Sequence, residues 1–396
     1  MDRLLKFTNR IMIFVVGIAL NFDYFTIGSV SLVSLFYIIY FLTAFLYIGS
    51  LSLNHFKRLL NPVIVYILLL IFINILNVNE TDSQVFPVSF IFCFILFLFA
   101  LNHLEKDSLA GVFLTSGIMT GGIILSICYL LDVGVEYELG RITLFGCNSN
   151  NLGCLMCLTF AIIIYDCIIK DIYHFEIFRF LFILLIVPIV LLILGTASRT
   201  AFLALFLVLL STLFLTPTRK KLTKVFVLIT LGISIACGYE YLEEYELMYD
   251  RIIESAEEGD ASGRDLIWTR LLTVAVENPM GIGQTGYTEY VNKNTTSNDI
   301  NGGASPHNVP LEIYLYTGFI GLFFMSIFGY RVFRSAWYKY RKENYLLPFL
   351  LVIVLIVQML FGQLLIFRTA WLSFAFICAF PKYSNQDCFK RNTTKL

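Results

Sequence analysis

Apolar stretches of about 20 residues recur along the whole chain, and this feature limits the folds open to it more than any other. As a helix, a stretch of that length crosses the ~30 Å hydrocarbon core of a membrane. Only 14% of the 396 residues are charged, against roughly 25% in a soluble domain. The sequence therefore predicts a polytopic membrane protein, with residues 1–396 forming one integral membrane domain.

Within a membrane the backbone can satisfy its hydrogen bonds only in helices or closed barrels, and these runs are too long and too uniformly apolar for barrel strands. We therefore expect an all-α protein with about twelve transmembrane helices. Their expected limits are 8–22, 26–48, 62–77, 86–103, 109–131, 151–169, 177–195, 200–216, 224–239, 309–330, 345–366 and 369–381.

The basic residues divide unequally between the two sides of these spans. If both termini lie inside, 21 of the 28 Lys and Arg fall on the cytoplasmic side. An excess of basic residues inside sets the orientation, so we expect the N- and C-termini in the cytoplasm. The seven outer basic residues are Arg141, Arg199, Arg251, Arg264, Arg270, Lys293 and Arg368.

Six of these seven outer cations are arginines, whereas the inner set holds twelve Lys and nine Arg. Arginine binds phosphate and carboxylate in a bidentate manner and keeps its charge. For a single arginine, pairing with one of the many outer carboxylates is an equally good interpretation. For the set we expect an anionic ligand, because several arginines lie at span ends outside the acidic stretch. The balance of charge gives no indication of nucleic-acid binding.

Several other classes of protein are not indicated. The first span lacks a cleavage site of small residues and is followed at once by another span, so no signal peptide is expected. Cys154-Leu-Met-Cys157 is a C-x-x-C inside an expected membrane helix without a second pair of ligands, and apolar packing is the better interpretation. Walker A, Rossmann and H-E-x-x-H motifs are absent, and we expect no metal and no cofactor.

One large outer loop, residues 240–308, separates the ninth and tenth spans. Its acidic beginning has helical periodicity and is expected to lie near the membrane surface. A second helix is expected to start with Ser262 as its N-cap, with Arg264 and Trp268 on one face. It should end near Pro279, before a tight turn at Gly281-Ile-Gly283, and a mobile polar stretch should then reach Ser305.

His307 is the only one of the four histidines expected on the outer side. It directly precedes Asn308 and the tenth span. As a structural residue it would lie at the interface near a helix N-terminus. As a functional residue it could act as a general base, because imidazole titrates near neutral pH.

Four short blocks between residues 140 and 325 form an ordered pattern. The first is Arg141-Ile-Thr-Leu-Phe-Gly146 followed by Asn148-Ser-Asn150. The second is Thr196-Ala-Ser198-Arg199, and the third is Ser262-Gly-Arg264-x-x-x-Trp268 followed by Glu277-x-Pro279-x-Gly281-x-Gly283. The fourth is His307-Asn-x-x-Leu311, with Gly318 seven residues further on.

With twelve spans and one large outer loop, these blocks resemble those of the O-antigen polymerase and O-antigen ligase (Wzy/WaaL) family of bacterial envelope enzymes. Ser149 stands where the family has proline in the first block. Arg270 and Gly281 also fit the family's Arg-x10-Gly spacing. The resemblance implies a GT-C type glycosyltransferase in the bacterial inner (cytoplasmic) membrane, with its active site facing the periplasm. It would invert the anomeric carbon and need neither nucleotide sugar nor metal.

The donor would be a glycan on undecaprenyl pyrophosphate, whose leaving group gains charge as the glycosidic bond breaks. Fixed guanidinium groups can stabilise that charge. The expected catalytic residues are His307, as the base that takes the acceptor proton, with Arg199 and Arg264. The expected substrate-binding residues are Arg141, Asn150, Arg251, Trp268, Arg270 and Asn308.

Two activities of this family and one outside it stay open. A polymerase would transfer the chain to another lipid-linked repeat, and the Asn-rich first block favours this reading. A ligase would transfer it to lipid A-core. A transporter or flippase for a lipid-linked sugar would form no new bond, but such proteins place charges near the bilayer midplane, where this chain has almost none. Expected partners are the lipid-linked donor and acceptor, membrane lipids and a chain-length regulator.

Overall fold

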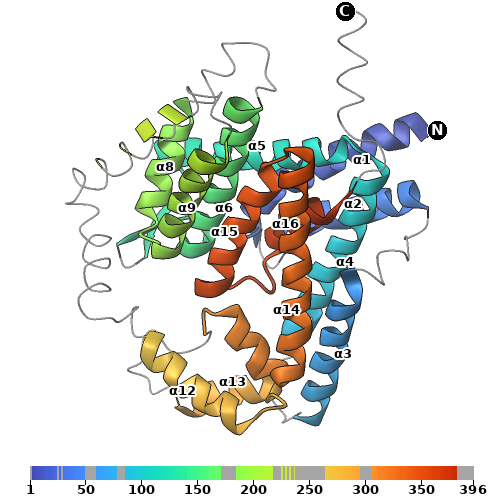
Figure 1. The fold of residues 1–396 in the computed structure, drawn as a ribbon, viewed down its shortest axis with the longest axis vertical. Helices are drawn as coiled ribbons and strands as arrows, with labels where there is room; N and C mark the ends of the chain where they lie inside the picture. The colour runs from blue at the N-terminus through green and yellow to red at the C-terminus, as the bar shows by residue number, and fades with distance from the viewer. Residues whose placement is uncertain are drawn as a thin grey trace, which may run out of the picture.

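Helices make up most of the structure, a computed structural model (Figure 1). It describes residues 2–24, 26–27, 30–49, 59–77, 85–138, 140–170, 184–216, 224–225, 228–229, 232, 236, 264–294 and 306–380. The α-helices are α1 Asp2–Ala19, α2 Leu32–Ile48, α3 Asn61–Leu76, α4 Val85–Lys106, α5 Ala110–Leu130, α6 Ser149–Ile163, α8 Ile186–Gly195, α9 Arg199–Leu215, α12 Arg264–Glu277, α13 Gly283–Asn294, α14 Val309–Glu343, α15 Leu347–Phe361 and α16 Arg368–Cys378. A 3-10 turn, η1 Leu20–Phe22, follows α1, and a π-helical turn, η3 Ile164–Ile169, follows α6.

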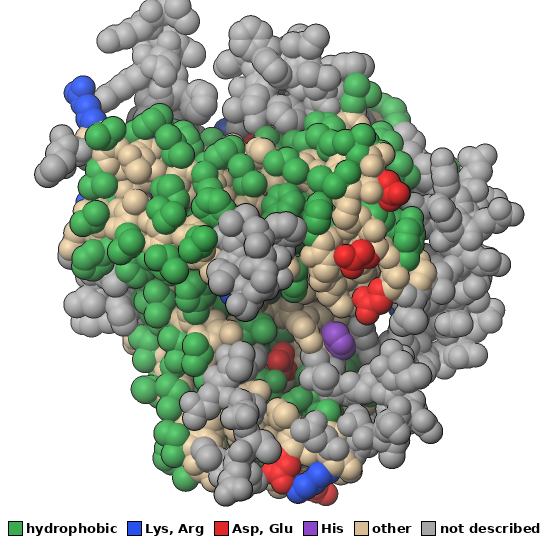
Figure 2. Space-filling model, turned by 180° about the vertical axis from the view of Figure 1, so that it is seen from behind, with side chains coloured by type: hydrophobic (Ala, Val, Ile, Leu, Met, Phe, Trp, Pro, Cys, Tyr) green, Lys and Arg blue, Asp and Glu red, His purple; other side chains and the backbone are tan. Residues whose placement is uncertain are grey.

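Five of the described helices are long and apolar enough to cross a membrane: Arg3–Phe22, Pro87–Lys106, Ala110–Leu130, Ser149–Asp166 and Val309–Glu343. Five shorter apolar helices accompany them. Large hydrophobic side chains such as Leu42, Phe45 and Phe214 are exposed, and green hydrophobic side chains cover much of the bundle surface in Figure 2. These features support a multi-pass membrane protein. The count of twelve and the orientation stay predictions, and the expected ninth span, 224–239, lies mostly outside the described residues.

The fold is helical as expected, except that two small antiparallel hairpins connect helices. Strands β1 Thr26–Ile27 and β2 Val30–Ser31 pair where the second span was expected to begin, so α2 starts later, at Leu32. Strands β3 Val135–Glu138 and β4 Arg141–Leu144 pair in the register Val135 with Leu144 and Glu138 with Arg141. β-branched residues in both hairpins favour extended backbone over helix.

Other boundaries also differ from the sequence expectations. The tenth span was expected to end at residue 330, whereas α14 continues to Glu343. The polar stretch expected to be mobile up to Ser305 contains α13, Gly283–Asn294. The expected second helix of the loop is present as α12 and ends at Glu277, before Pro279. The first expected loop helix and Ser262 lie outside the described residues.

Close packing of small residues joins α1 to α5. A Cβ added at Gly117 would stand 2.2 Å from the Phe14 carbonyl oxygen, and one at Gly17 would stand 2.7 Å from the Leu114 carbonyl oxygen. Because lipid tails are as apolar as Leu, helix association in membranes depends on such close backbone contact, and small residues permit it. α6 lies at the centre of the bundle, with contacts to α5, α8, α9 and α15.

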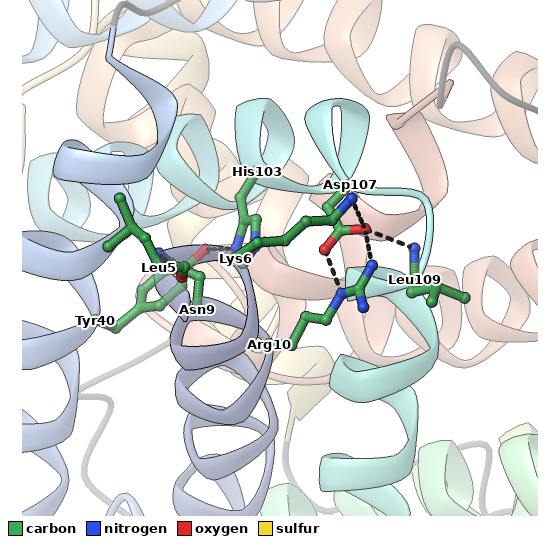
Figure 3. A network of polar contacts seen from close by, with 8 residues as sticks. All are labelled: Leu5, Lys6, Asn9, Arg10, Tyr40, His103, Asp107 and Leu109. Carbon is green, nitrogen blue, oxygen red and sulfur yellow. Dashed lines mark hydrogen bonds and ion pairs between the residues drawn. The ribbon is translucent and has the colours of Figure 1, made fainter. Parts of the chain in front are cut away.

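A polar cluster holds together the start of α1 and the connection from α4 to α5 (Figure 3). Arg10 donates to both carboxylate oxygens of Asp107, at 2.5 and 2.7 Å, and the Leu109 amide and Lys6 also face this carboxylate. Burial raises the pKa of Asp107, but the Arg10 bonds, the Leu109 bond and the Lys6 charge outweigh burial and leave the pKa below its ordinary value. The cluster is therefore a charged contact that joins α1 to the connection between α4 and α5, which is distant from α1 in the sequence.

The loop helices α12 and α13 lie at the lower end of the molecule, and the N-terminus lies toward its upper end (Figure 1). This arrangement agrees with an N-terminus opposite the large loop. α12 and α13 pack against α14, and α13 also packs against α3. The loop helices are therefore attached to the bundle through α14 and α3.

Candidate functional site

Residues from the first two sequence blocks meet in one polar cluster. Arg141, in β4, donates from Nε to the Thr196 carbonyl at 3.0 Å and from Nη2 to Asn150 Oδ1 at 2.8 Å. Ser198 Oγ donates to the same Asn150 oxygen at 2.8 Å. Thus Asn150, near the start of α6, joins the β4 strand to the turn between α8 and α9. We call Arg141, Asn150, Thr196, Ser198 and Arg199 the arginine cluster.

Two helices begin within the arginine cluster. Asn148 caps α6, because its side chain accepts from the Asn150 amide at 2.9 Å. Ser198 caps α9 by accepting from the Ala201 amide at 3.3 Å, and Arg199 is the first residue of that helix. The residue before this cap, Ala197, has a φ of 44°, so the chain turns sharply between α8 and α9. Helix N-termini carry partial positive charge, which adds to that of Arg141 and Arg199.

His307 and Asn308 lie at a different helix start. Asn308 caps α14 by accepting from the Leu311 amide at 3.0 Å. His307 is half-buried and has a φ of 46°, which is uncommon for a residue with a side chain. Trp268 in α12 donates from its indole Nε1 to the Pro306 carbonyl at 2.7 Å. The structure therefore brings the third and fourth sequence blocks together.

Both groups of motif residues lie near the end of α15 and the residues after it. Thr200, which follows Arg199, donates to the Phe361 carbonyl at 3.4 Å. Val309 and Pro310, which follow Asn308, line an apolar cavity with Leu364 and Leu365. The cavity has a volume of about 390 Å³ and is bounded by α14, α15 and α16. A lipid chain could occupy a space of this chemistry.

The remaining candidate residues are placed differently. Arg270 is exposed on α12. Arg264 begins α12, but its side chain is not described, so its expected position on the face of Trp268 stays a prediction. Arg251 lies outside the described residues. Lys293 pairs with Glu289 one helical turn away.

Arg368 pairs with a carboxylate, which is the alternative that the sequence left open for any single outer arginine. It forms an ion pair with Asp23, and its guanidinium lies 5.4 Å from the Tyr37 ring centroid and 5.5 Å from that of Phe92. Burial raises the pKa of Asp23 above its ordinary value, although Arg368 lowers it. Arg368 is thus engaged within the protein.

Sequence reasoning missed two groups of polar residues within the spans. Asn151 donates to the Tyr24 hydroxyl and accepts from Gln358 Nε2 at 3.2 Å. Glu312, buried one turn into α14, accepts from the Tyr316 hydroxyl at 3.1 Å. Gln358 and Glu312 are polar residues within otherwise apolar spans, and that signal could have identified them.

The described residues contain no group of three or more His, Cys, Asp or Glu side chains suited to hold a metal ion. The free cysteines Cys154 and Cys157 are buried within α6. Metal independence of the activity stays a prediction.

Residues 180–326 match a family model described as O-antigen ligase. The match includes the Ser198-Arg199, Trp268 and His307 blocks, and Arg141 and Asn150 precede it. The match supports the family that the sequence blocks indicated. The chain matches no curated protein at a significant level.

Proposed function

We propose that this chain is a member of the O-antigen polymerase and ligase (Wzy/WaaL) family and acts as an O-antigen-type polymerase, and the family-model match over residues 180–326 supports this. It joins oligosaccharide repeat units linked to undecaprenyl pyrophosphate at the outer face of the bacterial inner membrane. The observation that carries this proposal is the arginine cluster, in which two sequence blocks and two helix N-termini meet. Such a site suits a polyanionic leaving group.

The arginine cluster would stabilise the departing pyrophosphate. The Thr196 carbonyl and Asn150 side chain accept from two nitrogens of Arg141 and so fix the plane of its guanidinium. A guanidinium that is already oriented needs little reorganisation as charge develops on the leaving oxygen. Arg199 and, from the loop, Arg264 and Arg270 would add further positive charge, and Arg251 has the same proposed role.

His307 would serve as the general base. It accepts the proton of an acceptor hydroxyl, whose oxygen forms the new bond to the anomeric carbon as the bond to the phosphate oxygen breaks. Attack opposite the leaving group inverts the anomeric centre, and the electron pair of the broken bond leaves with the pyrophosphate. Asn308 supports this role by capping α14 directly after His307.

The polyprenyl chain of a lipid-linked substrate would lie in the apolar cavity between α14, α15 and α16. Val309 and Pro310 at one end of this cavity directly follow His307 and Asn308. A chain in the cavity would therefore bring its headgroup near the proposed base. We also expect the surrounding membrane lipids, and a chain-length regulator, to contact the protein.

A ligase that transfers the glycan to lipid A-core is the second candidate, and the description of the matching family model favours it. Both activities use the same donor chemistry and differ in the acceptor. A transporter or flippase for the lipid-linked sugar is a third possibility, which would leave the glycosidic bonds unchanged.

Purified protein in detergent, given a labelled lipid-linked repeat unit, separates these candidates. A polymerase forms a ladder of longer lipid-linked glycans from the repeat unit alone. A ligase forms a product only when lipid A-core is added. If labelled material keeps its original size with either acceptor, the glycosyltransferase proposal fails.

A further inference from the structure

The loop helices hold the segment that carries His307 at both of its ends. At one end, the Trp268 indole donates to the Pro306 carbonyl at 2.7 Å. At the other end, the chain after α12 enters a break in α14 at Gly318, where φ is 65° and ψ is −164°. Residues 306–317, including His307, therefore lie between two attachments to the loop.

The attachment at Gly318 replaces one hydrogen bond of the helix. In an unbroken helix the Phe319 amide would donate to the Leu315 carbonyl. Here the Phe319 amide donates to the Pro279 carbonyl at 3.0 Å, and the Leu315 carbonyl accepts from the Ile282 amide at 2.7 Å. The backbone of the loop thus satisfies both groups that the break leaves without helical partners.

Two glycines make this insertion possible. A Cβ at Gly318 would lie 2.3 Å from the Pro279 carbonyl oxygen, and one at Gly281 would lie 2.6 Å from the Gly318 amide nitrogen. Both residues have positive φ. We call this contact between Gly281 and Gly318 the glycine lock. It explains why glycine stands at these places in two sequence blocks.

The loop itself is fixed to the bundle. Asn74, near the end of α3, accepts from the amides of Gln284 at 2.9 Å and Thr285 at 3.3 Å, at the start of α13. The Asn74 contact and the glycine lock thus attach the loop to the bundle at two places, and neither attachment involves Trp268. Trp268 therefore belongs to a loop that is held against the bundle, and its indole binds Pro306 from this fixed position.

We propose that Trp268 is a positioning residue that acts through His307, rather than a residue that binds the substrate by stacking. The inference rests on the proposed role of His307 as base. Tryptophan has one donor, the indole N–H, and here Pro306 accepts from it. Fixing the Pro306 carbonyl fixes the peptide unit that leads into His307, whose positive φ leaves its backbone little freedom to adjust.

The substitution Trp268→Phe separates the effect of the indole N–H from the effect of the aromatic ring. Phenylalanine keeps an aromatic face but cannot donate to Pro306. We expect kcat of transfer to fall by about tenfold or more, because small misplacements of a catalytic group cost up to ~10²-fold. The KM values for donor and acceptor should stay within about twofold of wild type, since on this proposal Trp268 makes no contact with the substrates in their ground state.

A double-mutant cycle with His307→Ala decides whether Trp268 acts through the base. If it does, Trp268→Phe lowers the rate little further once His307 is gone, because residues that act as a unit are not additive. If Trp268 binds a sugar, the two losses multiply and the effect of Trp268→Phe lies in KM. Either of these last results would overturn the proposal.

Trp337→Phe, the same substitution near the far end of α14, is the matched control and should transfer at the wild-type rate. An inactive wild-type protein would refute the proposed function, and normal transfer by His307→Ala would refute the base. With those two established, wild-type kcat in Trp268→Phe refutes the positioning role alone. Failure of Trp268→Phe to accumulate as folded protein beside Trp337→Phe would also contradict it, since Trp268 would then be needed for the fold.

Discussion

Replacing Gly318 by alanine tests whether the glycine lock stabilises the protein. The added methyl group would meet the Pro279 carbonyl oxygen at 2.3 Å, in a backbone conformation that side chains rarely adopt. If residue 318 keeps this conformation, the protein carries backbone strain. If it becomes helical, α14 straightens and the loop loses its two hydrogen bonds to Leu315 and Phe319.

Either response should cost a similar amount. Strain at such a backbone conformation costs about 1–3 kcal/mol. Each of the two loop hydrogen bonds contributes about 0.5–1.5 kcal/mol. Because the straightened helix would regain one bond of its own, straightening costs a net of about one hydrogen bond. We therefore expect Gly318→Ala to lower the free energy of unfolding by about 1–2 kcal/mol.

The assay is thermal unfolding of the detergent-solubilised protein, followed by loss of the folded species in size-exclusion chromatography. For a chain of this size, about 1–2 °C per kcal/mol is expected, so the midpoint should fall by about 1–4 °C. Limited proteolysis should also cut faster between α12 and α13. Gly329→Ala in the same helix is the control, because a Cβ there meets nothing within 4 Å. Equal midpoints for Gly318→Ala and Gly329→Ala would refute the lock.

Three further results are expected. Arg141→Lys should lower transfer by about tenfold or more, because an ammonium cannot reproduce the fork that binds Thr196 and Asn150; a normal rate in membranes with normal protein levels would argue against the anion site. Asp107→Asn should lower the free energy of unfolding by about 2 kcal/mol by weakening charged hydrogen bonds. The folded pKa of Asp107 lies below its ordinary value of 3.8. The contribution of the Asp107 carboxylate to the free energy of unfolding is therefore present above about pH 4 and is lost as the pH falls through the folded pKa. A stability difference between Asp107→Asn and wild type that persists at low pH would contradict this. A reporter fused after Asn301 should be extracytoplasmic and one fused after Lys342 cytoplasmic, and reversal of either would invert the proposed topology.

Much of the helical framework could be predicted because hydropathy and helix length act locally. α3, α5 and α9 lie within one residue of the expected limits at each end. α12 was predicted from the N-cap signal at Ser262 and from Pro279, which cannot continue a regular helix. The hairpins were missed because strands of two to four residues leave too short a pattern to distinguish from the flanking apolar runs.

The contacts that organise the candidate site depend on tertiary structure and could not be predicted from local patterns. The break in α14 at Gly318 is stabilised by Pro279 and Ile282, which belong to a different part of the chain. The partner of Arg368 is Asp23, 345 residues away. By contrast, the blocks at Arg141, Ser198 and His307 were found because their order resembles a known family, and the structure then gave the partners of Arg141 and Ser198.

The most direct test of the account is the transfer rate of purified His307→Ala, measured with a labelled lipid-linked repeat unit beside the wild type. We predict that the wild-type protein lengthens the glycan and that His307→Ala is slower by more than about tenfold, at the low side of general-base effects of ~10²–10⁴. Binding of the lipid-linked donor should be retained, because the arginine cluster and the apolar cavity are unchanged. A His307→Ala rate within about twofold of wild type would contradict the base role, since loss of a general base costs far more.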